Sequence, residues 1–237
     1  MKQYFLGIEF GSTRIKAVLL DEKHAIVKSG DYTWKSSLEN GVWTYHMEDV
    51  QEGLRTAIRN LGELPGKISA MGVSGMMHGY LAFDKDWNLL APFRSWQNTM
   101  TGEAADKLTE AFGFNIPQRW SAAHLYQAVL NGEPHVKNIA HVTTLAGYVH
   151  YLLTGENVLG VGEASGMFPI ASETLTYDAA MLDKFDALMA KYGFDWNIRA
   201  VLPEVRTAGQ SAGLLTPSGS EYLGGLLPAG IPLCPPE

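Results

Sequence analysis

The segment Leu6–Asp21 reads LGIEFGSTRIKAVLLD, two apolar runs of strand length on either side of a turn of small residues. The turn carries two hydroxyls and a base, and its small residues leave backbone N–H groups open to an anion. Glu9 stands near the end of the first run, where its carboxylate can meet a cation. The segment therefore suits a nucleotide phosphate with its magnesium ion, although an ordinary surface hairpin has the same pattern.

Composition narrows the class of protein and of partner. The chain has 237 residues, of which 46% are hydrophobic, enough to bury one large core or two modest ones. Its net charge of −7, without clustered Lys and Arg, argues against a surface for nucleic acid or anionic membrane. We expect a small-molecule partner, with neither nucleic acid nor membrane involved.

Terminal and cysteine patterns add little chemistry. The first residues show no secretory cleavage pattern, and no apolar run is long enough to span a bilayer, so a cytoplasmic protein is expected. The lone Cys234 can form neither an intramolecular disulfide nor a thiolate zinc site.

The first hundred residues predict a strand-rich α/β arrangement. After the opening hairpin, strands or extended segments are predicted at 25–28, 41–45, 67–74, 80–83 and 89–93, the last two around a polar turn. One amphipathic helix is predicted between them, because apolar residues recur at helical spacing: Val50, Leu54, Ala57, Ile58 and Leu61.

The second half is predicted to be helical. Helices are expected at 101–112, 121–131, 143–154 and 178–192, each beginning at a capping residue and ending at a glycine. A short helix is expected with Pro217 at its first position, Ser218 and Glu221 having the spacing of a capping box. Residues 230–237 read as an extended segment entering a turn, so we expect the natural chain to continue beyond Glu237.

Several segments in sequence order carry a family resemblance. They are Gly7–Lys16, Gly72–Gly79 (GVSGMMHG), Ser95–Thr99 (SWQNT), Leu153–Glu156 with Glu163–Gly166 (LTGE and EASG) and Leu227–Leu233 (LPAGIPL). Together they resemble the N-terminal domain of FGGY-type carbohydrate kinases, and the xylulose kinase branch is closest.

The resemblance implies a ribonuclease-H-like, actin-like ATPase domain with a mixed β-sheet, in which residues 1–237 form the N-terminal, sugar-binding half of a two-domain enzyme. ATP and sugar would bind between the halves, and the γ-phosphoryl group would pass to a sugar hydroxyl with the help of Mg²⁺. The family's general base is an Asp just after the Gly-Ile-Pro segment. The base and the nucleotide-binding domain are thus expected beyond Glu237, so these residues alone should be inactive. Full-length relatives often form homodimers, which extends to this protein as an expectation.

The sugar contacts are expected from two segments. His78 follows an apolar strand at a glycine-flanked turn, where a neutral imidazole can bind vicinal hydroxyls or serve as a structural histidine. The resemblance favours the sugar role, with Met77 beside it and Gly79 allowing close backbone approach. Trp96 can line the pocket or fill a gap under the loop. Asn98 stands where the family usually has Asp, so its amide would contact hydroxyls without charge.

The nucleotide contacts are expected from the opening turn. Glu9 replaces the family's usual Asp, and we expect it to hold Mg²⁺ through a bridging water, since magnesium keeps several waters in such sites. The resemblance places Gly11, Ser12, Thr13 and Arg14 against phosphate oxygens of ATP.

Four further residues have weaker assignments. Lys16 lies on the outgoing strand, where a solvated position is expected. Glu163, Ser165 and Gly166 match a segment near the active cleft of the family, while a turn cap explains them equally well.

The sequence thus predicts the N-terminal half of an ATP-dependent kinase for a ketose such as xylulose. Two alternatives stay open: a family member that acts on rhamnulose, glycerol or a similar polyol, and a non-catalytic actin-like module that binds sugar.

Overall fold

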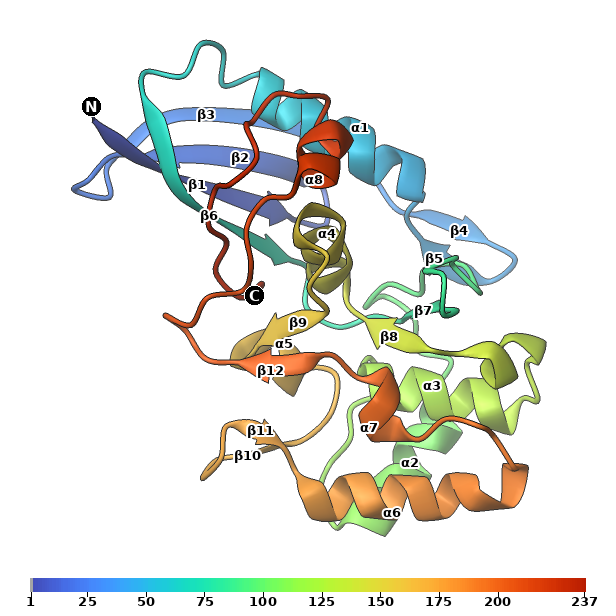
Figure 1. Ribbon diagram of the computed structural model, residues 1–237. Helices are drawn as coiled ribbons and strands as arrows, with labels where there is room; N and C mark the ends of the chain where they lie inside the picture. Colours follow the sequence, from blue (N-terminus) through green and yellow to red (C-terminus); the bar gives the residue numbers. More distant parts are fainter. Residues whose placement is uncertain (1) are drawn as a thin grey trace.

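The computed structural model describes residues 2–237 and has the expected mixed α/β architecture (Figure 1). Its main sheet has the order β3-β2-β1-β6. The strands are β1 (Gln3–Phe10), β2 (Arg14–Leu20), β3 (Ile26–Thr33) and β6 (Lys67–Gly75). β2 is antiparallel to β1, which confirms the opening hairpin, and β6 is parallel to β1. β3 is longer than the predicted 25–28 because it pairs along the whole length of β2.

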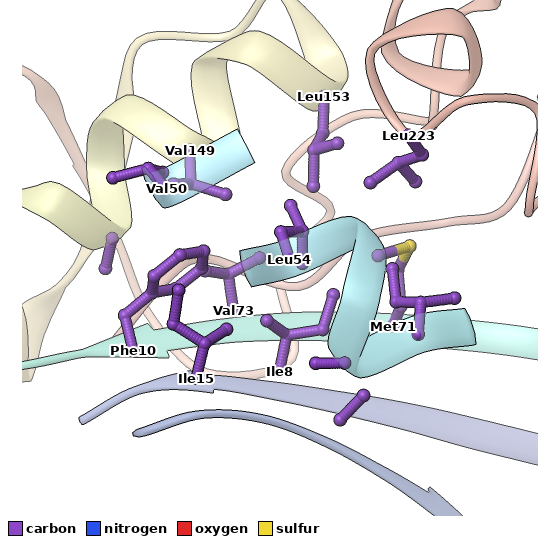
Figure 2. Close-up of a cluster of buried hydrophobic side chains, with 14 of the residues drawn as sticks. Ile8, Phe10, Ile15, Val50, Leu54, Met71, Val73, Val149, Leu153 and Leu223 are labelled. Carbon is purple, nitrogen blue, oxygen red and sulfur yellow. The ribbon is translucent and has the colours of Figure 1, made fainter. Parts of the chain in front are cut away.

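Three helices cover one face of this sheet: α1 (Met47–Arg59), α4 (Leu145–Thr154) and α8 (Pro217–Tyr222). Strand side chains alternate between faces, so every second residue of β1, such as Ile8 and Phe10, points into this core. Figure 2 shows Leu54 of α1, Val149 of α4 and Leu223 after α8 converging on these strand residues. The intervening position, Glu9, is left on the opposite face.

The end of the chain runs beside β6 as the extended segment that the sequence predicts. Met71 donates a backbone hydrogen bond to the Pro232 carbonyl at 2.9 Å, and Glu237 donates one to Val73 at 3.0 Å. Met71 and Leu233 form a parallel bridge. The segment therefore continues the parallel part of the sheet.

A second core lies among the helices of the later residues. Its largest members are α2 (Gly102–Phe112), α3 (Ser121–Leu130) and α6 (Ala179–Met189). The shorter helical segments are α5 (Val161–Ser165), α7 (Ile198–Val201), η1 (Pro134–Asn138) and η2 (Ala190–Tyr192). The chain thus buries two cores, one of the two arrangements that its length allows.

The remaining strands form four short pairs. They are β4 (Ser37–Glu39) with β5 (Val42–Thr44), β7 (Leu81–Phe83) with β8 (His141–Thr143), β9 (Val158–Gly160) with β12 (Glu204–Arg206), and β10 (Ile170–Ala171) with β11 (Thr176–Tyr177). Residues of β7 and the residue before it alternate between the two cores: Leu81 and Phe83 belong to the first, and Tyr80 and Ala82 to the second. β7 therefore lies between the cores.

Several helix starts differ from the sequence prediction. The helix expected from 143 begins at Leu145, because Thr143 ends β8 and Thr144 is the cap, its hydroxyl accepting from the Gly147 N–H. Thr101 does not cap α2, since its hydroxyl donates to the Gln118 carbonyl instead. In α8 the cap is Thr216, which accepts from the Gly219 N–H, rather than Ser218. Local caps thus begin α4 and α8, whereas at α2 a tertiary hydrogen bond takes the hydroxyl of the expected cap.

None of the helices within residues 2–237 combines the length and apolar character that a membrane crossing requires.

Candidate functional site

The carboxyl ends of the parallel strands β1 and β6 lie at the same edge of the sheet, where α/β folds commonly bind ligands. There the pairing register aligns Glu9 of β1 with Lys16 of β2 and with Ser74 of β6. The Lys16 Nζ lies 2.9 Å from a carboxylate oxygen of Glu9. Lys16, expected on a solvated face, is therefore paired with the acidic residue of the site.

The turn after β1 is held from below by two aromatic side chains. The Trp34 indole N–H donates to the Gly11 carbonyl at 2.7 Å, and the Tyr45 hydroxyl donates to the Ser12 carbonyl at 2.8 Å. The two rings pack with their centroids 4.4 Å apart. Because both carbonyls are held, the position of the turn is fixed before any ligand arrives.

Two other residues of this turn, Thr13 and Arg14, which the sequence predicts to contact phosphate, have partners within the chain. An Arg14 guanidinium nitrogen lies 3.6 Å from the Asp31 carboxylate of β3, and the Thr13 carbonyl accepts from the Trp34 N–H. Neither side chain lines the cavity described below. Gly11 and Ser12 are the turn residues that do.

His78 occupies a turn in a rarely populated backbone conformation. Its φ is 73°, and that of Gly79 is 107°. Such values cost about 1–3 kcal/mol in a residue with a side chain and persist only where the surroundings impose them. The His78 Nδ1 lies 3.2 Å from the Gly166 carbonyl, a contact that orients the ring. Burial lowers the pKa of His78, and the Arg119 guanidinium lowers it further, so the imidazole is neutral near pH 7.

Gly79 is required for a reason other than the expected one. A Cβ on Gly79 would lie 2.8 Å from the Phe93 ring and 2.9 Å from the Arg94 carbonyl, and the positive φ also disfavours a side chain. The close approach is thus to the protein's own chain, and Gly79 does not line the cavity.

Asn98 is placed in the interior, away from the cavity. It is 3% exposed, its oxygen accepts from the Trp43 N–H at 2.9 Å, and its NH₂ group donates to the carbonyls of Trp43 and Ser95 at 2.8 and 2.9 Å. These bonds use both N–H donors of the amide and one acceptor position of its oxygen, so Asn98 fixes the loop that carries Trp96.

The remaining predicted residues meet in one cavity of about 430 Å³ at the carboxyl edge of the sheet. Trp96 and Met77 are each 39% exposed and form part of its wall. Its lining is Glu9, Gly11, Ser12, Ser74, Gly75, Met76, Met77, His78, Trp96 and Arg119. The cavity therefore brings Glu9 and the turn after β1 together with Met77 and His78.

Sequence reasoning missed Arg119, Ser74 and Met76. Ser74 and Met76 belong to the quoted Gly72–Gly79 segment, and strand alternation could have placed Ser74 on the face of Glu9. Arg119 lies in the loop before α3, and its carbonyl accepts from the Gly79 N–H at 3.4 Å. No local pattern marks that arginine, because a contact across 40 residues brings it to the site.

A larger hollow, of about 540 Å³, lies at the opposite, amino-terminal end of β1 and β6. Its lining is mostly Gly, Pro, Ala and aliphatic residues, and Lys67 is its charged side chain. The charged and polar side chains that could bind a ligand therefore lie in the smaller cavity, which is the candidate site.

For Glu163, Ser165 and Gly166 the sequence left two roles open, a place near the active cleft or a turn cap, and the three residues differ in their contacts. The Ser165 hydroxyl donates to the Gly162 carbonyl at 2.6 Å within α5, as a local turn residue does. Gly166 instead contacts His78. Glu163 is 2% exposed, and burial raises its pKa to about 7.

The expected Mg²⁺ site can be compared with the side chains that lie there. Within residues 2–237, no three His, Cys, Asp or Glu side chains gather closely enough to hold a metal ion. Mg²⁺ at nucleotide sites commonly uses one or two carboxylates, with waters and phosphate oxygens completing its shell. The Glu9 carboxylate, with the Ser12 and Ser74 residues beside it, fits that limited contribution.

Comparisons with known proteins identify the family. Residues 4–234 match the model described as the FGGY family of carbohydrate kinases, N-terminal domain. The chain belongs to this family.

Its relatives include a glycerol kinase of Thermococcus gammatolerans, 25% identical over 245 residues that cover 96% of this chain and 47% of that protein. A xylulose kinase of Haemophilus influenzae is 23% identical over 241 residues, covering 93% and 47%. This member of the FGGY family thus spans about half the length of these relatives.

Solved structures confirm the fold. The xylulose kinase of Rhodospirillum rubrum superposes with a TM-score of 0.83 at 21% identity, over 99% of this chain and 49% of that one. The Plasmodium falciparum glycerol kinase with ADP gives a TM-score of 0.77 at 18% identity, over 99% and 48%. The expected actin-like ATPase fold of the FGGY kinases is therefore confirmed.

Proposed function

We propose that residues 1–237 form the sugar-binding domain of an ATP-dependent carbohydrate kinase, with a ketose such as xylulose as the leading acceptor. The observation that carries the proposal is the shared cavity. His78, Met77 and Trp96 meet Glu9, Gly11 and Ser12 in one hollow, so an acceptor hydroxyl and a nucleotide phosphate can be brought together.

In this proposal the protein acts by positioning and by charge. The neutral His78 and the faces of Trp96 and Met77 hold the polyol, since a sugar presents both hydroxyls and C–H surfaces. The turn at Gly11 and Ser12 faces the phosphates, and Lys16 with Arg119 supplies positive charge near them. Phosphoryl transfer depends mainly on such placement and electrostatic stabilisation.

The cofactors follow from the same arrangement. ATP is the proposed phosphoryl donor, which the ADP complex of the glycerol kinase relative supports. Glu9, through a water, would hold Mg²⁺, which when bound neutralises charge on the phosphates. The general base and the nucleotide-binding domain are proposed to lie outside residues 1–237. We therefore expect no sugar-dependent ATP turnover from this chain alone.

The identity of the acceptor is open to a direct test. Relatives include both glycerol and xylulose kinases, so a panel of xylulose, ribulose, rhamnulose, glycerol and gluconate is titrated into the ¹⁵N-labelled chain. We expect one class of polyol to shift the Trp96 indole and the Met77 and His78 amides, with a dissociation constant in the millimolar range, because a half-open cavity leaves its hydrogen bonds in competition with water.

Matched variants separate binding from general effects. His78→Gln should weaken binding about tenfold. His141→Gln, which changes a partly buried histidine away from the cavity, should leave it unchanged. Absence of a response at the cavity for every polyol would contradict the proposed function. Sugar-dependent ADP formation by the chain would show that the base lies within these residues.

A further inference from the structure

Gly166 lies against the Nδ1 edge of the His78 ring. It follows α5, and its carbonyl oxygen is 3.2 Å from the Nδ1 of His78. The two residues are 88 positions apart in the chain, so their contact belongs to the tertiary structure.

The absence of a side chain at Gly166 has a specific cause. A Cβ built there would lie 2.7 Å from the His78 Nδ1 and 3.1 Å from the Met77 Cγ, the first a distance that real Cβ atoms essentially never show. The φ of Gly166 is −86°, which any residue adopts. Glycine is therefore needed here for the space that His78 and Met77 occupy rather than for its backbone conformation.

The contact also determines where the imidazole carries its proton. A carbonyl oxygen only accepts hydrogen bonds, so the Nδ1 of His78 must be the donor. In a neutral imidazole the other nitrogen, Nε2, then has a free lone pair, and it points away from Nδ1 across the ring. Burial and Arg119 keep the pKa of His78 low, so this neutral form is the one present near pH 7.

We propose that Gly166 is a positioning residue that fixes His78 in the Nδ1–H tautomer, so that Nε2 faces the cavity as an acceptor for a ligand hydroxyl. The proposal rests on the proposed function for the identity of the ligand as a polyol. It adds a selection rule: the group opposite His78 must donate a hydrogen bond. A carbonyl or carboxylate oxygen there would place its lone pairs against the lone pair of Nε2. This disfavours binding of a sugar with its keto group opposite His78.

The tautomer can be measured without any ligand. Long-range ¹H–¹⁵N spectra of the labelled chain distinguish Nδ1–H from Nε2–H imidazoles by their nitrogen shifts, and the His78→Gln spectrum assigns the signal. We expect the Nδ1–H pattern at pH 7. An Nε2–H pattern, or a doubly protonated ring, would overturn the proposal.

A pair of glycine variants tests the role of Gly166. Gly166→Ala should displace the ring, change the His78 nitrogen shifts and weaken polyol binding about tenfold. Gly102→Ala is the matched control, because a Cβ there would meet only the Gln118 side chain at an ordinary 3.6 Å. Unchanged His78 shifts in Gly166→Ala would overturn the proposal. If that variant does not fold, the wild-type tautomer still decides.

The two proposals fail in different ways. An Nδ1–H ring in a chain that binds no polyol would contradict the proposed function and leave the tautomer assignment intact. Polyol binding to a chain whose His78 carries its proton on Nε2 would overturn the role of Gly166 alone.

Discussion

At the scale of single residues, Asn98 has a role in the structure that its place in a sequence motif does not indicate. The motif places it beside Trp96, and sequence reasoning therefore expects a substrate contact. Its hydrogen-bond partner Trp43 lies 55 positions away, a relation that no local pattern contains. Glu9 and His78 both line the cavity, because Glu9 lies at the end of β1 and His78 lies in the turn after β6, two strands that the apolar pattern already predicts.

Restoring the family's usual residue at this position should harm the protein. Asn98→Asp replaces an NH₂ donor by a carboxylate oxygen that faces two carbonyls in the interior. We expect the free energy of unfolding, measured with guanidinium at pH 7, to fall by about 3 kcal/mol.

The loss should shrink as the pH falls, because the new carboxyl group regains one donor when it is protonated. A variant as stable as the wild type, with stronger polyol binding, would show that residue 98 reaches the substrate after all.

At the scale of secondary-structure elements, long periodic segments are predictable and short ones are not. The hairpin β1–β2, helix α1 and helix α4 follow from apolar spacing and glycine ends. The three-residue strands β9 and β12 and the short helix α5 are too brief to show a period, although they link the two cores. The cap predicted at Thr101 is wrong because the Gln118 carbonyl takes its hydroxyl. Pro217 does begin α8 as predicted, but Thr216 caps the helix and the capping box expected from Ser218 does not form.

The packing of α1 on the sheet provides a prediction at this scale. A Cβ on Gly30 of β3 would lie 2.2 Å from the Ala57 carbonyl of α1, so the helix crosses the strand at that glycine. Gly30→Ala should lower the free energy of unfolding by about 2 kcal/mol through overpacking.

Gly7→Ala in β1 is the control for that variant, since its Cβ would lie 4.0 Å from the nearest atom, the Val18 carbonyl. It should change stability by less than about 0.5 kcal/mol. The free energy of unfolding of both variants is measured with guanidinium. Equal losses would show that the strands themselves, rather than the contact with α1, are sensitive to a substitution of glycine.

At the scale of the whole molecule, the order of the motifs predicted a single site, and the structure places most of them around one cavity. The division into two cores could not be predicted, because it depends on β7 sending alternate side chains to each. Figure 1 shows helix α5 between the main sheet and the helices of the second core. Ala164 belongs to the second core, while Gly166, directly after the helix, contacts His78 of the site. Changes in α5 should therefore affect stability and the site together.

Glu163 of α5 makes global stability depend on pH. Burial, with the Glu237 carboxylate nearby, raises its pKa from 4.5 to about 7, and its Oε1 has no hydrogen-bond partner among the described residues. Between these two values the folded protein keeps a proton that the unfolded chain has lost. The contribution of Glu163 is therefore most favourable below pH 4.5 and declines as the pH rises to 7, by roughly 3 kcal/mol in total.

Two buried histidines act in the opposite direction. Burial lowers the pKa of His124 to about 3 and that of His150 to about 4, so their contributions are complete above pH 6.5 and decline as the pH falls. Both histidines are present in Glu163→Gln and in the wild type, so their contributions cancel when the two proteins are compared. We expect the variant's free energy of unfolding, relative to the wild type, to increase by roughly 3 kcal/mol between pH 4.5 and pH 7.5 in guanidinium titrations. A difference that stays flat over this range would mean that the Glu163 carboxyl is hydrated in the folded state and that its burial does not raise its pKa.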